Sequence, residues 1–303
     1  MKYDKDLFTE HSGETVTEGW QTLKDGKDEC HAHWRDICNV HYNKYFPYAD
    51  SNFVSGFKND PPARFWEMEL ALTLINAGFK IDSKDYGPDV HLLTEKNIWL
   101  EAVCPEMGKK ELPDSIQYYD ERPSSEKIIL RLTNSITSKF KTYQTYIKEN
   151  VCSGDEPFII AINGCRLTQG GGDDLTPRIV KAVFGGGDDV ISFKGSSQEV
   201  TFKCVEKKFI TKSNEPKRSI DTTFFKDNNY SGISAILYSD SSYQHMPIEN
   251  GSDFLMVHNP SARNPIEVGL LAFGKEYIPE KSNSLASKLR IIDHRILRES
   301  LYI

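Results

Sequence analysis

The sequence predicts an α/β fold, because segments with helical periodicity alternate with short apolar runs. Residues 63–79 have the periodicity of a buried helix, and residues 79–82 begin a first strand. A hairpin follows in residues 87–105, and a second helical pattern covers residues 130–149. The apolar run 158–163 then has the composition of a buried strand. The predicted order is therefore helix, three strands, helix and strand.

The chain divides into three predicted sections, and Pro61–Pro62 marks the first boundary. Residues 1–62 form an N-terminal helical section, residues 63–167 the core, and residues 168–303 a C-terminal α+β section that we expect to pack on the core. A helix at about residues 27–45 brings together two cysteines and two histidines, Cys30, His33, Cys38 and His41. Their spacing matches no standard zinc motif and follows one helix face, so we favour packing over a zinc site.

The first core helix carries a charged residue, Glu67, on its predicted buried face. Apolar or small residues follow it at helical spacing: Leu70, Ala71, Leu74 and Gly78. This spacing predicts that Glu67 shares their buried stripe and that Glu69 lies on another side. A buried carboxylate is costly unless it is paired or bound to a metal ion, and Arg64 is expected either as its neighbour or as a phosphate contact. The alternative is an exposed first-turn glutamate that the helix dipole favours.

Two apolar runs, residues 90–93 and 98–103, flank the polar residues 94–96 and predict a β-hairpin. Pairing across this loop places Asp89 opposite Glu101, on the same face of the hairpin. Directly opposed side chains have Cβ atoms about 5 Å apart, and like charges there destabilise a sheet. The usual compensation is a divalent cation, and two carboxylates with room for water and phosphate suit Mg²⁺. Two ordinary surface acids are the alternative, which the apolar surroundings of Glu101 disfavour.

These residues carry a resemblance to a known family. Gly87-Pro88-Asp89, the hairpin and Glu101-Ala102-Val103 resemble the active-site strands of the PD-(D/E)xK nuclease superfamily, which includes many restriction endonucleases. The resemblance covers residues 64–163, and it implies a restriction-endonuclease-like αβββαβ core in which helices flank a mixed sheet. The expected activity is metal-dependent hydrolysis of phosphodiester bonds in DNA, in restriction or defence.

The resemblance also implies roles for individual residues. Asp89 and Glu101 are expected to bind Mg²⁺, for which Mn²⁺ can substitute, and the carbonyl of Ala102 is expected to complete the shell. In the superfamily the helix before the hairpin often supplies a third acid, for which Glu67 is the candidate here. Cleavage of both DNA strands would favour a two-fold homodimer that presents one site to each strand.

The chain departs from the family pattern at Val103, where the superfamily has a lysine. Some members relocate or replace that lysine, and the resemblance therefore offers Lys139 and Arg131, both in the helix at 130–149. Either would hold the attacking water or stabilise charge on the phosphate, although most helix lysines are simply solvated. Three explanations stay open: a relocated base, a second metal ion, or lost catalysis. The competing hypotheses are a catalytically degenerate nucleic-acid-binding protein and an RNA-directed nuclease.

The C-terminal section has strand-like runs at residues 190–193, 199–205, 233–237 and 254–257. Two GGGDD copies, residues 170–174 and 185–189, lack the context of a phosphate-binding loop, so we expect flexible loops. Residues 106–126 predict a long loop that reaches over substrate, and residues 283–299 predict a helix. The basic residues 203–218 are a candidate contact for a phosphate backbone, with a solvated loop as the alternative.

Composition restricts the class of protein. The formal charge of -7 argues against a protein that coats nucleic acid non-specifically, but it leaves room for a nuclease whose site acids add negative charge. The six cysteines form no compact framework, which fits reduced thiols. The N-terminus has no signal-peptide pattern, and no apolar run approaches the roughly 20 residues that span a bilayer. We therefore expect a cytoplasmic protein that does not bind membranes.

Overall fold

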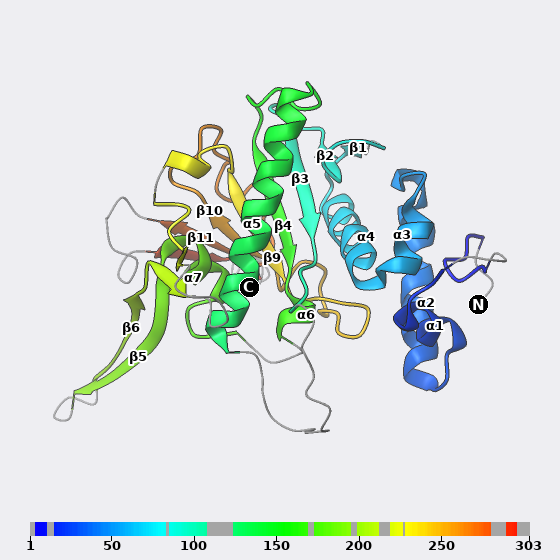
Figure 1. Cartoon of the computed structure of the whole chain (residues 1–303), viewed down its shortest axis with the longest axis horizontal. Coiled ribbons are helices and arrows are strands. Elements are labelled where there is room, and N and C mark those ends of the chain that lie inside the picture. The colour runs from blue at the N-terminus through cyan, green and yellow to red at the C-terminus, as the bar shows by residue number, and fades with distance from the viewer. Residues whose placement is uncertain are drawn as a thin grey trace, which may run out of the picture.

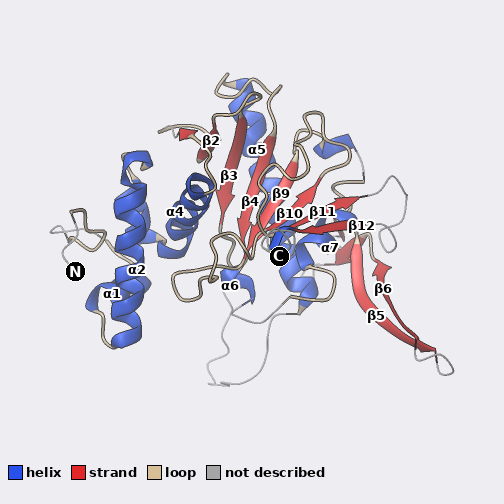
Figure 2. Ribbon diagram, turned by 180° about the vertical axis from the view of Figure 1, so that it is seen from behind, coloured by secondary structure: helices blue, strands red, loops and turns tan. Residues whose placement is uncertain are grey.

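The computed structural model describes residues 4–10, 15–82, 85–107, 124–168, 173–194, 199–211, 219–226, 228–279 and 289–295. Within these residues the chain forms a large mixed sheet flanked by helices (Figures 1 and 2). The α/β class that the sequence predicts is therefore confirmed. None of the described helices is both long enough and apolar enough to cross a membrane.

The elements follow one another as listed here. The helices are α1 (Glu18–Asp25), α2 (Glu29–Tyr45), α3 (Phe53–Asn59), α4 (Pro61–Asn76), α5 (Ser125–Lys148), α6 (Cys165–Thr168) and α7 (Arg178–Phe184), with 3-10 turns η1 (Phe46–Tyr48) and η2 (Asn228–Tyr230). The strands are β1 (Ile81–Asp82), β2 (Val90–Leu92), β3 (Ile98–Val103), β4 (Phe158–Asn163), β5 (Gly186–Lys194), β6 (Glu199–Glu206), β7 (Phe209–Thr211), β8 (Ser219–Asp221), β9 (Ala235–Ser239), β10 (Leu255–His258), β11 (Lys275–Pro279) and β12 (Leu289–Asp293). The predicted order of helix, three strands, helix and strand is observed as α4, β1, β2, β3, α5 and β4.

The large sheet has the strand order β1-β2-β3-β4-β9-β10-β11-β12. Strands β3, β4 and β9 are parallel neighbours at its centre, whereas β2 pairs with β3 and β9 pairs with β10 in antiparallel fashion. The C-terminal strands therefore continue the sheet that the central section begins. Short ribbons β5-β6 and β7-β8 stand apart from it, and β5-β6 projects from the body (Figure 2).

The sheet separates two apolar cores. Alternate residues of β4 point to opposite faces, so Ile159 and Ala161 pack with α4 while Ile160 and Ile162 pack with α5 and α7. Burial on both faces explains why β4 is a continuous apolar run rather than an alternating one. Helix α5 crosses one face of the sheet, as Figure 1 shows, and α4 covers the opposite face of β3 and β4.

Local signals fix the start of both core helices. Asp60 caps α4 by accepting a hydrogen bond from the backbone N–H of Ala63, and Pro61 occupies the first turn, where its missing N–H has no cost. Ser124 caps α5 by accepting a hydrogen bond from the backbone N–H of Lys127. The apolar stripe of α5 is buried as the periodicity predicts, whereas α4 is buried on almost every side.

The N-terminal helices α1 to α3 lie beyond α4 at one end of the molecule (Figure 1). The helix predicted at residues 27–45 is α2. Of the cysteines that it carries, Cys30 is exposed and Cys38 is buried, so they do not share a site. His41 instead lies 3.0 Å from the carboxylate of Glu69 on α4, which ties the two helices together.

Two C-terminal predictions are wrong. The second GGGDD copy does not form a loop, because Gly185 ends α7 in a left-handed conformation and residues 186–189 begin β5. Part of the tail predicted as a helix forms the strand β12, which pairs antiparallel with β11. Most of the expected substrate loop, residues 108–123, lies outside the described residues, as do residues 212–218 of the basic segment.

Candidate active site

The hairpin has the register that the sequence predicts. Val90 pairs with Leu100 and Leu92 with Ile98. One step further outward, the same register sets Asp89 opposite Glu101. Gly87 begins the approach to β2 with a φ of 140°, a conformation that side chains other than glycine rarely adopt. The hairpin therefore delivers both carboxylates to one face at the edge of the parallel centre of the sheet.

Glu101 is a buried carboxylate with only one of its two oxygens in contact with a partner. It is 3% exposed, and its Oε1 accepts a hydrogen bond of 2.7 Å from Nζ of Lys139 on α5. Its Oε2 is buried and has no hydrogen-bond partner among the described residues. Burial and the charge of Asp89 raise the pKa of Glu101 to about 7, against the opposing effect of Lys139. A buried polar atom without a partner lowers the stability of the fold by about 1–3 kcal/mol. A proton or a cation that binds Oε2 would remove this cost.

Asp89 lies half-buried beside it. Its Oδ2 accepts a hydrogen bond of 2.7 Å from the backbone N–H of Ala102. Burial raises the pKa of Asp89, while Lys139, the Ala102 amide and Arg64 lower it. The contact seen at Ala102 is made by its N–H, and the expected role of its carbonyl stays a prediction.

Glu67 reaches the same electrostatic cluster from α4. Arg64 donates a hydrogen bond of 2.7 Å to Oε2 of Glu67, so it is the neighbour that the sequence predicts, and it also lies 3.2 Å from the carboxylate of Asp50. Burial and the charge of Asp89 raise the pKa of Glu67 to about 8, against the opposing effect of Arg64. The charge of Asp89 therefore raises the pKa of both Glu67 and Glu101, which places the three carboxyl groups in one region.

The other glutamate of α4, Glu69, is more deeply buried than sequence periodicity suggests. It is 0% exposed and contacts His41 and the hydroxyl of Thr73. It lies on another side of α4 from Glu67, as predicted, but that side is covered by α2 instead of solvent. This carboxylate is satisfied by its neighbours, and we assign it to packing.

The two cations proposed on α5 have different positions. Lys139 binds Glu101 directly, and its pKa is raised by Glu101, Asp89 and Glu67 although burial opposes this. Arg131 lies about 12 Å from Lys139 along the helix axis, at about 1.5 Å per residue. Among the described residues, Arg131 forms no hydrogen bond or ion pair with the carboxylates of Glu67, Asp89 or Glu101.

Sequence reasoning missed three residues that border the cluster. Asp50 follows η1 and binds Arg64, while Tyr45 of α2 and Tyr146 of α5 lie near enough to the acids for the acids' charges to shift their pKa values. Burial and the charges of Glu67 and Asp89 raise the pKa of Tyr45; burial and the charges of Glu101 and Asp89 raise that of Tyr146. Tyr146 follows Lys139 by two helical turns on the same face, which is a signal that the sequence contained.

The donor chemistry fits a hard divalent cation. Carboxylate oxygens are the ligands that Mg²⁺ prefers, and the unpaired Oε2 of Glu101 lacks the positive partner that a cation would provide. No group of three or more histidine, cysteine, aspartate or glutamate side chains in the described part of the chain is already arranged around a metal position. The expectation that Asp89, Glu101, Ala102 and Glu67 bind Mg²⁺ therefore stays a prediction.

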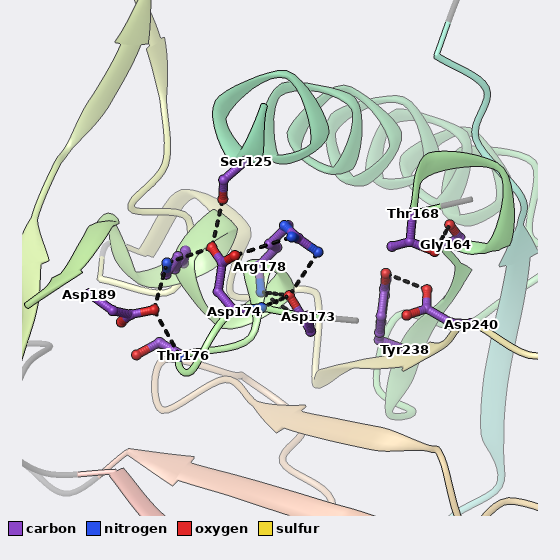
Figure 3. A network of polar contacts seen from close by, with 11 residues as sticks. Ser125, Gly164, Thr168, Asp173, Asp174, Thr176, Arg178, Asp189, Tyr238 and Asp240 are labelled. Atoms are coloured by element: carbon purple, nitrogen blue, oxygen red, sulfur yellow. Dashed lines mark hydrogen bonds and ion pairs between the residues drawn. The ribbon is translucent and has the colours of Figure 1, made fainter. Parts of the chain in front are cut away.

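A second polar network, around α7, contains acids from both GGGDD copies (Figure 3). Asp173 and Asp174 of the first copy pair with Arg178 at 3.2 and 3.1 Å. Lys181 lies between Asp174, at 2.7 Å, and Asp189 of the second copy, at 3.0 Å. Both copies therefore supply acids to the cations of one helix. Opposite charges within reach of each other satisfy this network internally, so we assign it to structure.

The structure thus brings together four of the five predicted catalytic side chains, Glu67, Asp89, Glu101 and Lys139, and leaves Arg131 apart. Val103 is half-buried and packs against the apolar core on the α5 side, so an apolar side chain fills the position at which the resembled superfamily has a lysine. No protein-family model, curated protein or solved structure matches the chain.

Proposed function

We propose that this protein is a Mg²⁺-dependent endonuclease that hydrolyses phosphodiester bonds in DNA, built on a restriction-endonuclease-like core. One observation carries the proposal: Glu101 is buried beside Asp89, holds Lys139 on one oxygen and leaves the other oxygen without a partner. A buried acid in this state needs a proton or a cation. The order α4, β1, β2, β3, α5, β4 supports the same fold assignment.

Asp89 and Glu101 would hold the ion, with Glu67 acting directly or through water and the Ala102 carbonyl completing the shell. When bound, Mg²⁺ supplies positive charge that lowers the pKa of water and neutralises charge that develops on the phosphate. With raised pKa values of about 8 for Glu67 and about 7 for Glu101, Glu67 is mostly protonated and Glu101 partly protonated at neutral pH in the ion's absence. Binding of the ion therefore requires them to release protons.

Lys139 takes the place of the family's lysine in this proposal. Its Nζ lies 2.7 Å from Oε1 of Glu101, although it comes from α5 rather than from the strand position that Val103 occupies. A cation there orients the Glu101 carboxylate, holds a water by hydrogen bonding and offsets negative charge on a bound phosphate. Arg64 has a positioning role, because it fixes Glu67 against Asp50.

Val103 favours one alternative, a nucleic-acid-binding protein that has lost catalysis. The two proposals differ in whether the Asp89–Glu101 pair supports bond cleavage or only binding. Substrate class also separates a deoxyribonuclease from an RNA-directed nuclease, since the carboxylate cluster carries no information about the sugar.

The test is cleavage of supercoiled plasmid and of a structured RNA with Mg²⁺, Mn²⁺ or EDTA. The variants are Asp89→Asn and Glu101→Gln, and Glu95→Gln, an exposed acid in the loop of the same hairpin, is the matched control. We expect metal-dependent nicking or linearisation of DNA by the wild type and by Glu95→Gln, and none by the other two. Binding of DNA without cleavage by the folded wild type under every metal condition would reject the enzyme and favour the degenerate binding protein.

A further inference from the structure

Two cysteine thiols meet at the carboxyl ends of the central parallel strands. The Sγ atoms of Cys104 and Cys165 are 3.8 Å apart. Cys104 directly follows β3, and Cys165 begins α6 just after β4. Val103 pairs with Ile162 in the parallel register of β3 and β4, so the next residues of the two strands, Cys104 and Asn163, lie side by side. Strands distant in sequence therefore hold this thiol pair in contact.

Asn163 fixes both cysteines. Its Oδ1 accepts a hydrogen bond of 3.0 Å from the backbone N–H of Cys165 and a longer one of 3.8 Å from the thiol of Cys104. Its Nδ2 donates at 2.7 Å to the carbonyl of Ser241. Asn163 is 0% exposed, so this arrangement belongs to the folded core and not to a surface loop.

The two thiols differ in accessibility and acidity. Cys104 is buried, whereas Cys165 is only partly buried. The hydrogen bond with Cys104 lowers the pKa of Cys165. A more acidic, more accessible thiol beside a buried partner has the properties of a redox-sensitive pair, in which the first thiol reacts and the second resolves the product.

We propose that Cys104 and Cys165 form a reversible intramolecular disulfide when the folded protein meets a peroxide. The Cys165 thiolate attacks one peroxide oxygen, the O–O bond breaks, and hydroxide leaves, which gives a sulfenic acid on Cys165. The Cys104 sulfur then loses its proton to that hydroxide and attacks the Cys165 sulfur. The S–S bond forms, the S–O bond breaks, and the departing hydroxide takes up a proton from solvent. Two thiols and one peroxide thus give one disulfide and two waters, with two electrons passing to the peroxide.

The required movement is small. A disulfide has an S–S distance of about 2.05 Å, so the sulfurs must approach by about 1.8 Å from their separation of 3.8 Å. Arg166, which follows Cys165, pairs with Asp60, the residue that caps α4, and donates to the carbonyl of Cys104 at 3.5 Å. Through Arg166 and Asp60, the disulfide would be linked to α4, which carries Glu67. Through Cys104 it would be linked to β3, which carries Glu101. Its formation does not depend on the proposed nuclease activity.

The experiment counts reactive thiols by mass. The full-length native protein is treated with hydrogen peroxide, denatured with excess N-ethylmaleimide, and its intact mass is compared with that of untreated protein. We expect oxidised wild type to lose two maleimide adducts, to regain them after dithiothreitol, and to yield a Cys104–Cys165 cross-linked peptide on proteolysis. Cys165→Ser and Cys104→Ala should each abolish the paired loss, while Cys30→Ser, which removes an exposed cysteine, should retain it.

Two results would overturn the proposal. One is wild-type protein that keeps both adducts or yields only sulfinic acid on Cys165. The other is a loss of two maleimide adducts that persists in Cys165→Ser. Because Cys165 is partly exposed, this substitution should disturb the fold less than a substitution of the buried Cys104. Far-ultraviolet circular dichroism before and after oxidation shows that the protein tested is folded.

Discussion

Replacing the buried carboxylate of Glu101 by an uncharged amide, Glu101→Gln, is expected to stabilise the metal-free protein more at high pH than at low pH. The pKa of Glu101 is raised from its usual 4.5 to about 7 in the folded state, chiefly by burial and by Asp89. A folded state with a raised pKa binds more protons than the unfolded chain. Its contribution to stability is therefore present below pH 4.5 and is lost as the pH rises through about 7.

The magnitude follows from the same shift. A rise from 4.5 to about 7 corresponds to about 3 kcal/mol, at about 1.4 kcal/mol per pKa unit. Most of this penalty, about 2–3 kcal/mol, develops between about pH 5 and pH 8. Glutamine has no ionisation penalty in this range. The variant also loses the ion pair with Lys139, which changes its free energy of unfolding. This change is the same at both pH values, because Lys139 stays protonated.

The assay is urea unfolding in EDTA at about pH 5 and pH 8, with the free energy of unfolding of wild type, Glu101→Gln and Glu95→Gln at each pH. The difference between Glu101→Gln and wild type should move in favour of the variant by about 2 kcal/mol from the lower to the higher pH. The exposed Glu95→Gln control should show no such movement. A difference that is independent of pH, or that moves against the variant, would refute the description of Glu101 as a buried acid with a raised pKa.

Three other perturbations have defined outcomes. Lys139→Met should lower the rate of DNA cleavage by about 10²-fold or more, whereas Lys141→Met, at an exposed position, should leave the rate unchanged. Equal rates in a single-turnover plasmid assay would exclude a role for Lys139. His41→Ala leaves the buried carboxylate of Glu69 with the hydroxyl of Thr73 as a remaining partner and should lower the free energy of unfolding by about 2 kcal/mol, whereas the exposed His33→Ala should change it little. Equal urea midpoints for the two variants would contradict this. Mg²⁺ at about 100 times its dissociation constant should add about 2.7 kcal/mol to wild-type stability, visible as a higher melting temperature that Asp89→Asn lacks, and an equal gain in that variant would place the ion elsewhere.

The parts of the fold that the sequence predicted correctly depend on local patterns. The periodicity of α5, the apolar run of β4 and the hairpin register all arise within one or two neighbouring segments. The hairpin register alone sets Asp89 opposite Glu101, and it needs no contact between distant segments. That is why the centre of the candidate site was predictable.

The parts that failed depend on contacts between distant segments. The segment of β12 has a helical pattern, but its pairing with β11 makes it a strand. The second GGGDD copy looks like a loop in the sequence, but pairing with β6 and the ion pair of Asp189 with Lys181 on α7 hold it in β5. Glu69 is buried only because α2 covers that side of α4. Asp50 and Tyr45 join the site from the N-terminal section by tertiary packing, which no periodicity could show.

Titration of the metal-free protein with Mg²⁺, followed by calorimetry near pH 6.5 in two buffers of different ionisation enthalpy, tests the central claim most directly. If Asp89 and Glu101 hold a divalent cation, wild type and Glu95→Gln should bind it with release of about one proton from Glu101, whose pKa is about 7 before the ion binds, and of up to one more from Glu67, whose pKa is about 8. Glu101→Gln should lose both the binding and the proton release. Binding of equal affinity and equal proton release in wild type and Glu101→Gln would contradict the assignment of this carboxylate pair as the metal site.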